Sequence, residues 1–251
     1  MMEEKRDPTA ELFLLFKGKP VVIKRTDVGE VKGTLVSYDP ETRTVHTDSG
    51  KVLVERIHML KSPAKVKPKE PETPFEKLAM EKEVFLYFIG GGRKRAKFRG
   101  DYVYFVLVKD KDMVKAYAKI RMVGLSLRNP FKGIEGEPES VSFPIPGKWR
   151  EEFAELFPII QDEVEEDKVY EVEFLLRDGR VVKGYSAKFY LSSFYKFRVF
   201  ENPDLKGVSL NLYPHSIEDI ISLENTGEEF RLAAKKEPSG PGGEFINGGD
   251  K

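Results

Sequence analysis

A run of cations follows three consecutive glycines near the middle of the chain, in the sequence GGGRKRAKFR at residues 90–99. Positive charges this close together repel one another unless an anion or an acidic surface compensates them. We therefore predict a flexible loop ahead of a strand, in which Arg93, Arg95 and Arg99 bind phosphate. A solvated hairpin loop without a ligand is an equally good interpretation. The run is no nucleotide-binding P-loop, because no Gly-Lys-Ser/Thr follows it and no helix is expected to begin there.

A second set of candidate binding residues lies nearer the N-terminus. Lysines and arginines recur there at spacings that would let them follow a nucleic-acid backbone, and Tyr102 and Tyr104 would be available to stack on bases. The basic residues of this set are Lys17, Lys19, Lys24, Arg25, Lys32 and Arg43. The residues that we expect to contact nucleic acid are Lys24, Arg25, Lys32, Tyr38, Asp39 and Arg43.

Catalytic and metal chemistry find little support in the sequence. The chain has no cysteine and only three histidines, His46, His58 and His215, which are too few soft ligands for a zinc site. Carboxylate pairs such as Glu151-Glu152 are adjacent, so their side chains diverge on a helix. No serine lies in a nucleophile elbow. We therefore predict a non-enzymatic binding or regulatory protein without a metal or cofactor.

Charge and hydropathy narrow the class of protein further. Lys and Arg number 42 and Asp and Glu also number 42, so the chain as a whole is not a simple basic nucleic-acid binder. Residues 1–69 carry 14 basic against 10 acidic side chains, which is a mild N-terminal surplus. No apolar run reaches the length of about 18 residues that a membrane helix needs, and the first residues are charged. We expect a soluble, cytoplasmic protein with no membrane insertion.

Strand and turn patterns divide the chain into three β segments. Short runs rich in β-branched and aromatic residues alternate with turn residues, and helices are expected over residues 8–17 and 149–160. We therefore predict a mainly β fold of tandem small bent barrels with short helices. The predicted organisation is a barrel at 1–61, a proline- and lysine-rich linker at 62–74, a middle barrel at 75–147, a helix and acidic linker at 148–167, a third barrel at 168–226 and a disordered tail at 227–251.

One strand pattern occurs near both ends of the chain. Residues 21–39 and 172–190 each have the pattern of a strand, a tight turn and a second strand that carries a glycine, Gly33 in the first copy and Gly184 in the second. An Asp-Gly pair closes the predicted hairpin of the second copy. Glycine inside a strand permits a sharp bend, and such bends roll a short sheet into a small barrel.

The N-terminal copy resembles the Sm-like fold that includes Hfq. The likeness rests on a short helix followed by V-x-I, a turn and V-x-G-x-L-x-x-Y-D, in which Gly33 and Asp39 take the places of the family's glycine and loop acid. It implies a five-stranded bent barrel that forms rings and binds single-stranded RNA, with bases stacked near the loops. Arg43 stands where the family usually has Asn, and the family's Arg-Gly pair is not found around residues 55–57.

The C-terminal copy is similar to the same family. Gly184 matches Gly33, the sequence Tyr-Pro-His-Ser-Ile at 213–217 is similar to the Tyr-Lys-His signature of Hfq, and Tyr190 stands in place of the loop acid. His215 fits a structural position better than a ligand-binding one. The aromatics Phe189, Tyr190, Phe194 and Tyr195 fit a filled barrel core better than a surface that stacks on RNA bases.

The middle segment resembles a PilZ domain, or else a third Sm-like barrel. In PilZ domains an Arg-x-x-x-Arg motif ahead of β-strands binds cyclic di-GMP, and Arg95 and Arg99 have that spacing. Of the next PilZ element only Gly124 is present. In the alternative, Gly100 takes the place of Gly33.

Three functions follow from these interpretations. The first is RNA binding through Sm-like barrels, the second is a cyclic di-GMP receptor or effector, and the third is a structural adaptor for protein partners. Barrels of this kind expose edge strands, so we expect self-association, with three barrels per chain forming part of a ring.

Overall fold

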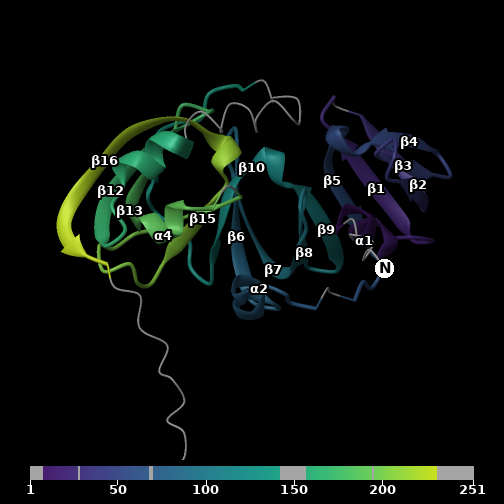
Figure 1. Cartoon of the computed structure of the whole chain (residues 1–251). Coiled ribbons are helices and arrows are strands. Elements are labelled where there is room, and N and C mark those ends of the chain that lie inside the picture. The colour runs from purple at the N-terminus through teal and green to yellow at the C-terminus, as the bar shows by residue number, and fades with distance from the viewer. Residues whose placement is uncertain (1–7, 28, 68–69, 142–156, 194, 231–251) are drawn as a thin grey trace, which may run out of the picture.

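The structure is a computed structural model that describes residues 8–27, 29–67, 70–141, 157–193 and 195–230. Its strands form one antiparallel sheet that is open at both ends (Figure 1). The strand order along the sheet is β16-β12-β13-β14-β15-β10-β6-β7-β8-β9-β5-β1-β2-β3-β4, and β11 pairs with β13 outside this path. The prediction of a mainly β protein is confirmed. Separate small barrels stay a prediction, because the pairings run continuously from one end strand to the other.

The first five strands form what we call the N-terminal unit, residues 8–62. Its sheet order is β5-β1-β2-β3-β4, and Leu12, Phe13 and Phe16 in and just after its helix are fully buried against the strands. Burial of such side chains stabilises the fold by about 1.5–3 kcal/mol each. The elements are α1 (Pro8–Leu14), β1 (Pro20–Arg25), β2 (Glu30–Asp39), β3 (Thr44–Thr47), β4 (Gly50–Leu53), the 3-10 turn η1 (Val54–Arg56) and β5 (Ile57–Ser62).

The middle unit, residues 74–127, repeats this arrangement with the order β10-β6-β7-β8-β9. Its helix starts with a capping box, in which the Thr73 hydroxyl accepts from the Glu76 amide at 3.1 Å and the Glu76 carboxylate accepts from the Thr73 amide at 3.0 Å. The elements are α2 (Pro74–Ala79), β6 (Glu83–Phe88), β7 (Arg93–Asp101), β8 (Phe105–Asp110), β9 (Met113–Ala118), η2 (Lys119–Arg121) and β10 (Met122–Leu127).

The C-terminal unit, residues 157–229, has the order β16-β12-β13-β14-β15. Residues 157–163 are helical and precede the first strand, as α1 and α2 do in the other units. The elements are β12 (Lys168–Leu176), β13 (Val181–Ala187), α4 (Lys188–Leu191), β14 (Phe197–Phe200), β15 (Ser209–Leu212), η3 (Pro214–Ser216) and β16 (Ile217–Glu229), and β11 (Ile134–Glu135) adds to β13.

A 3-10 turn stands between the fourth and fifth strands of every unit. In each unit the carbonyl of the last residue of this turn accepts a hydrogen bond from the amide of the residue that directly follows the unit's first strand. The three bonds run from Thr26 N to Arg56 O at 2.9 Å, from Ile89 N to Arg121 O at 3.0 Å, and from Arg177 N to Ser216 O at 2.9 Å. One backbone contact recurring three times shows that the chain contains three copies of one folding pattern.

The units join by strand pairing, and the two junctions share one register. At the first junction β5 pairs with β9 and Met59 lies opposite Tyr117; at the second β10 pairs with β15 and Gly124 lies opposite Leu212. Met59 and Gly124 each lie two residues after the first residue of a fifth strand, Ile57 or Met122. Tyr117 and Leu212 each lie two residues before a 3-10 turn. The fifth strand of one unit therefore meets the fourth strand of the next in the same way twice.

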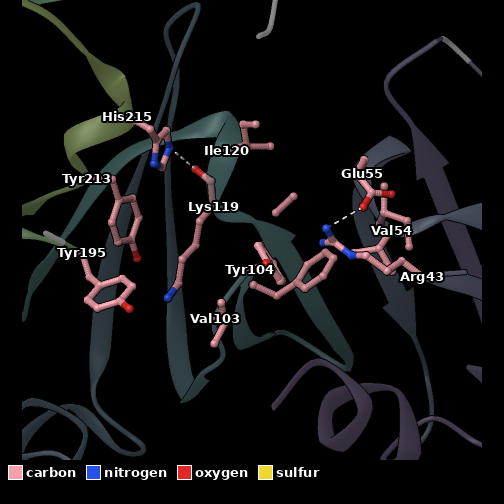
Figure 2. A pocket seen from close by; sticks show the side chains of 13 residues that line it. Arg43, Val54, Glu55, Val103, Tyr104, Lys119, Ile120, Tyr195, Tyr213 and His215 are labelled. Atoms are coloured by element: carbon pink, nitrogen blue, oxygen red, sulfur yellow. Dashed lines mark hydrogen bonds and ion pairs between the residues drawn. The ribbon is translucent and has the colours of Figure 1, made fainter. Parts of the chain in front are cut away.

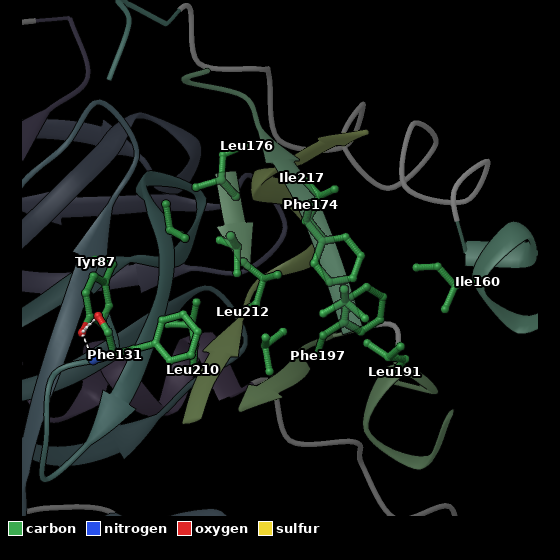
Figure 3. Packing of buried hydrophobic residues seen from close by; sticks show 14 of the residues in the cluster. Tyr87, Phe131, Ile160, Phe174, Leu176, Leu191, Phe197, Leu210, Leu212 and Ile217 are labelled. Carbon is green, nitrogen blue, oxygen red and sulfur yellow. Dashed lines mark hydrogen bonds between the residues drawn. The ribbon is translucent and has the colours of Figure 1, made fainter. Parts of the chain in front are cut away.

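Buried clusters extend across these junctions. Figure 3 shows Phe174, Phe197 and Leu212 of the C-terminal unit directed into one cluster that also holds Tyr87 of the middle unit. The Tyr87 hydroxyl accepts a hydrogen bond from the Phe131 amide at 2.6 Å. In the same way, Phe105 of the middle unit packs in the N-terminal cluster. Shared cores of this kind hold the three units together as one layer of packed strands.

The predicted bending glycine of the C-terminal unit lies where two strands come close together. A Cβ added to Gly184 would lie 2.4 Å from the carbonyl oxygen of Phe200 on the neighbouring strand β14. A backbone oxygen cannot move aside as a flexible side chain can, so only glycine permits this approach. At Gly33 an added Cβ would instead meet the side chain of Asp48, at 2.2 Å.

Several predicted boundaries change. Residues 93–101 form strand β7, so the cation run is not the flexible loop that we expected, and the turn before it consists of Ile89, Gly90, Gly91 and Gly92. The predicted tail starts at residue 227, but β16 continues to Glu229. The rest of that tail and most of the helix predicted at 149–160 lie outside the described residues. Within the described part of the chain, no helix is long and apolar enough to cross a membrane.

Candidate nucleic-acid interface

Turns from all three units line one hollow on the molecule (Figure 2). In the N-terminal and middle units, the residue before the third strand and the 3-10 turn come together there. The amide of Val54 donates to the carbonyl of Arg43 at 2.9 Å, and the amide of Lys119 donates to the carbonyl of Tyr104 at 2.8 Å. The lining residues are Arg43, Val54, Glu55, Ile57, Val103, Tyr104, Phe105, Ala118, Lys119, Ile120, Tyr195, Tyr213 and His215.

The N-terminal edge of the hollow holds a stacked cation. The Arg43 guanidinium lies 4.7 Å from the centre of the Tyr104 ring and 2.9 Å from a carboxylate oxygen of Glu55. Arg43 has a positive φ of 50°, which turns the chain sharply just before β3 and helps to place its side chain over the neighbouring unit. An aromatic ring and a guanidinium thus face the hollow as one stacked group.

The centre of the hollow contains a second cation beside an aromatic ring. The Lys119 ammonium forms an ion pair with Asp101 and lies 5.6 Å from the centre of the Tyr213 ring. Tyr213 is 3% exposed, and its burial raises the pKa of its hydroxyl well above the usual value. Its ring therefore packs near the Lys119 ammonium and has little exposed surface of its own.

His215 connects two units at the C-terminal edge. Its Nε2 donates to the carbonyl of Lys119 at 2.8 Å, and its ring stacks on Tyr213 with centroids 5.7 Å apart. Burial lowers the pKa of His215 to about 4, so the imidazole is neutral near pH 7. These contacts agree with the structural position expected for this histidine. Tyr195 lies next to Tyr213 in Figure 2, is 71% exposed, and so presents a ring to solvent.

Of the six residues expected to contact nucleic acid, Arg43 alone lines this hollow. Arg25 pairs with Asp27, and the Lys32 ammonium lies 2.8 Å from the Glu30 carboxylate. Lys24 is exposed at the end of β1. The remaining two stabilise their own unit: the Tyr38 ring lies 5.0 Å from that of Phe13, and Asp39 accepts hydrogen bonds from the Glu41 amide at 3.0 Å and the Thr42 hydroxyl at 2.6 Å.

The three arginines expected to bind phosphate project from β7 and do not line this hollow. Arg95 donates to both carboxylate oxygens of Glu83, at 2.9 Å from its Nε and 2.5 Å from its terminal nitrogen. Arg99 pairs with Glu81, and the Arg93 guanidinium lies 5.7 Å from the centre of the Phe85 ring. Glu81, just before β6, and Glu83, its first residue, thus compensate part of the positive charge of the cation run.

Three lining residues were missed as candidate site residues. Lys119 and Tyr213 belong to the 3-10 turns or adjoin them, and only an alignment of the three units on these turns would have drawn attention to them. Tyr195 was expected to fill a core, and this is wrong, because it is exposed; Phe189 is also 54% exposed. Phe194 lies outside the described residues. Tyr102, considered for stacking with Tyr104, is 2% exposed and packs in the N-terminal cluster.

Comparisons of the chain with protein-family models, with curated proteins and with solved structures find no match. The chemistry of the hollow is therefore interpreted from its own geometry. It combines two cations with an exposed aromatic ring, Tyr195, and a partly exposed one, Tyr104. Among the described residues, no group of three or more histidines and carboxylates is placed to hold a metal ion.

Proposed function

We propose that the protein binds single-stranded RNA in the hollow formed by the turns of its three units. The observation that carries this proposal is the convergence of Arg43, Tyr104, Lys119 and Tyr195 from three units at one place. Cations beside aromatic rings suit a nucleic-acid strand, since the cations neutralise phosphates and the rings stack on bases. Single strands need this combination because their bases are not already stacked in a duplex.

The size of the hollow indicates how a strand would lie. The hollow is small, with a cavity volume of about 70 Å³. Bases would therefore rest on the rings of Tyr195 and Tyr104 at the rim, and phosphates would face Lys119 and Arg43. Such an interface has little sequence preference, because every base offers a flat face to an aromatic ring.

The proposal extends the resemblance to the Sm-like family from two units to three. In support of it, each unit has a helix, five strands in the order 5-1-2-3-4 and a 3-10 turn before the fifth strand. For the middle unit this arrangement favours the Sm-like interpretation, with Gly100 in the place of Gly33, over the PilZ one. The proposal is therefore that the chain consists of three small bent barrels, joined where the fifth strand of one barrel pairs with the fourth strand of the next.

Fluorescence anisotropy with a labelled single-stranded RNA tests the binding proposal. We expect Kd to rise several-fold or more with moderate salt, because phosphate contacts release counterions. Tyr195→Ala should weaken binding about tenfold, since loss of one stacked base costs about 1–3 kcal/mol. Phe189→Ala is the matched control, an exposed aromatic of the same unit that does not line the hollow. Equal affinity in both variants, or no binding by the wild type at low salt, would overturn the proposal.

Self-association follows from the shared register of the two junctions. A third junction of the same kind would join β16 of one chain to β4 of a second copy, and these are the two end strands of the open sheet. It would place Asp219 opposite Val52 and Ile220 opposite Lys51. Ile221 is 52% exposed on β16 and Leu53 is 42% exposed on β4, so each edge offers apolar surface to a partner. Such head-to-tail contacts close into a ring when the rotation permits it.

The mass of the protein in solution tests this assembly. We expect the wild type to form a closed assembly of two or more copies, measured by light scattering after gel filtration. Ile220→Pro should release single chains, because proline cannot donate to a new strand and is tolerated at an edge. Leu78→Ser is the control, since Leu78 is an exposed apolar residue of α2 away from both edges. A wild type that stays a single chain at high concentration would contradict the assembly.

A cyclic di-GMP receptor has less support, because Arg95 and Arg99 pair with Glu83 and Glu81 and do not line the hollow in which cations and aromatic rings of three units meet. It predicts a rise in melting temperature with cyclic di-GMP that Arg95→Ala abolishes. An adaptor for protein partners predicts neither RNA binding nor this shift. Absence of RNA binding together with a cyclic di-GMP-dependent shift that Arg95→Ala abolishes would therefore favour the receptor.

A further inference from the structure

A second hollow lies at the junction between the N-terminal and middle units. It has a volume of about 290 Å³, and no residue lines both hollows, although β5, β9 and the turn η2 each contribute residues to both. The turn between β6 and β7 forms one side and the junction strands form the other. Its lining residues are His58, Phe88, Ile89, Gly91, Gly92, Arg93, Lys94, Tyr117 and Arg121.

Every described charged residue that lines this hollow is a cation. Arg93, Lys94 and Arg121 contribute side chains to it, and among the described residues no carboxylate does. Several other cations of β7, β9 and η2 have carboxylate partners. Three such pairs are Arg95 with Glu83, Lys115 with Asp110 and Lys119 with Asp101. Lys94 instead lies over an aromatic ring, with its ammonium 5.5 Å from the centre of Tyr117 and 3.4 Å from the Tyr117 hydroxyl.

The positive charges are close enough to act on one another. Burial, together with the charges of Arg121, Lys24 and Lys94, lowers the pKa of His58 to about 4. Burial and the charge of Lys115 lower the pKa of Lys94, although Asp110 partly offsets this effect. Like charges gathered in a partly buried hollow raise the local potential, and an anion that enters it relieves the repulsion.

The second junction shows that the fold itself does not require these cations. There Val123 takes the place of His58, Leu212 that of Tyr117, and Ser216 that of Arg121. Val181 and Val182 take the places of Arg93 and Lys94. Val123, Leu212, Ser216 and Val182 are fully buried, so the corresponding space is filled. A position that is packed and apolar at one junction is therefore open and basic at the other.

We propose that the hollow between the N-terminal and middle units binds the phosphate group of a nucleotide. Arg93 and Arg121 bind phosphate oxygens through their guanidinium groups, which present paired N–H donors in one plane. Lys94 adds a point charge. The rings of Phe88 and Tyr117, which meet edge to face at 5.2 Å, give the base or sugar an apolar wall. The phosphate belongs either to a free nucleotide or to an RNA strand, and this site needs no RNA in the first hollow.

Thermal shift and calorimetric titration with AMP and with pyrophosphate at low salt test the proposal on the full chain. We expect both to raise the melting temperature of the wild type. Lys94→Gln and Arg93→Gln, both exposed changes, should weaken AMP binding at least about tenfold, because hydrogen bonds to charged groups are strong. Lys97→Gln is the matched control, an exposed cation of β7 that lies outside the hollow. Arg121→Gln is included only if its unfolding curve matches that of the wild type.

The source of the phosphate is tested in the Tyr195→Ala background, in which RNA binding to the first hollow is weakened. Competition by AMP there supports a free nucleotide, and competition by an oligonucleotide but not by AMP supports an RNA phosphate. If Lys94→Gln abolishes the competition in either case, the phosphate site is upheld. This holds even where Tyr195→Ala has no effect on RNA binding and the proposal of RNA binding in the first hollow fails. Equal AMP affinity in Lys94→Gln, Lys97→Gln and the wild type, or no response to either anion, would overturn it.

Discussion

The two junctions between units share one strand register but are held by different chemistry. At the first, cations surround an open hollow that His58 lines. At the second, a buried ion pair fastens the turn after β12 to the turn after β6. The same backbone pairing thus serves once as a place open to a ligand and once as a closed joint. Side chains beside the strands, and not the strands themselves, decide which of the two a junction becomes.

The buried pair consists of Asp178 and Arg180. Their closest atoms are 2.7 Å apart, Asp178 is fully buried and Arg180 is 7% exposed. The Gly90 amide donates to Asp178 at 2.8 Å, and Arg180 donates to the Phe88 carbonyl at 2.7 Å. Burial alone would raise the pKa of Asp178, but the hydrogen bonds from Arg180 and Gly90 outweigh burial and lower it. The pair therefore stays charged at neutral pH and connects two units.

The largest predicted effect is that of Asp178→Ala on the second junction. This change leaves the Arg180 guanidinium buried without its carboxylate, which costs about 3–5 kcal/mol of unfolding free energy. Urea unfolding measures it. Glu83→Ala is the matched control, because it also removes a carboxylate from a guanidinium, but from an exposed one. A similar loss in both variants would show that the buried pair does not hold the junction.

Acid should weaken the same pair. Because the folded-state pKa of Asp178 is lowered, its contribution is present above the usual Asp pKa of about 3.9 and is lost as pH falls through the folded value. The Asp178→Ala variant should therefore lose less stability than the wild type as the pH is lowered below about 4.

The second prediction concerns His58→Val, a substitution that makes the first junction resemble the second. Folding lowers the pKa of His58 and of His215 to about 4, from an ordinary value near 6.5. Between these values the unfolded chain binds up to about two more protons, so stability falls with acid by at most about 1.4 kcal/mol per pH unit for each. His58→Val, which copies Val123, should remove about half of this slope. Unfolding at a series of pH values measures the slope.

A control variant separates this effect from simple repacking. Lys61→Gln removes a charge from the same strand β5 without removing a histidine, so it should leave the slope between pH 6.5 and 4 nearly unchanged. A His58→Val variant with the full wild-type slope would show that this histidine titrates alike in the folded and unfolded chain.

Local sequence patterns predicted the strands because these depend on neighbours in the chain. The alternation around Val21 and Ile23, the hairpin at Asp178-Gly179 and the need for glycine at position 184 all follow from residues a few positions apart. The pairing of β5 with β9 joins residues more than 50 positions apart. No local signal specifies it, so the continuous sheet could not be predicted from the sequence.

The site was predicted less well for a related reason. Three glycines suggested that the cations after them lie in a loop, whereas Ala96 and Phe98 are buried and alternate with exposed cations as a strand requires. Arg43 was identified because it follows a visible turn. Lys119 and Tyr195 come from units that meet Arg43 only in the folded chain, and their pattern resembles that of ordinary surface and core residues.

The smallest predicted effects come from two neighbouring cations of β7 and are opposite in sign. Without phosphate, Arg95→Gln loses the exposed pair with Glu83 and should lower the unfolding free energy by up to about 1 kcal/mol. Lys94→Gln removes one of several crowded cations, whose pKa is lowered in the folded state, so stability should be unchanged or slightly raised. Pyrophosphate should reverse this order, because it stabilises the wild type and Arg95→Gln but not Lys94→Gln. Urea unfolding with and without pyrophosphate measures both, and an order that pyrophosphate leaves unchanged would show that the first junction holds no anion.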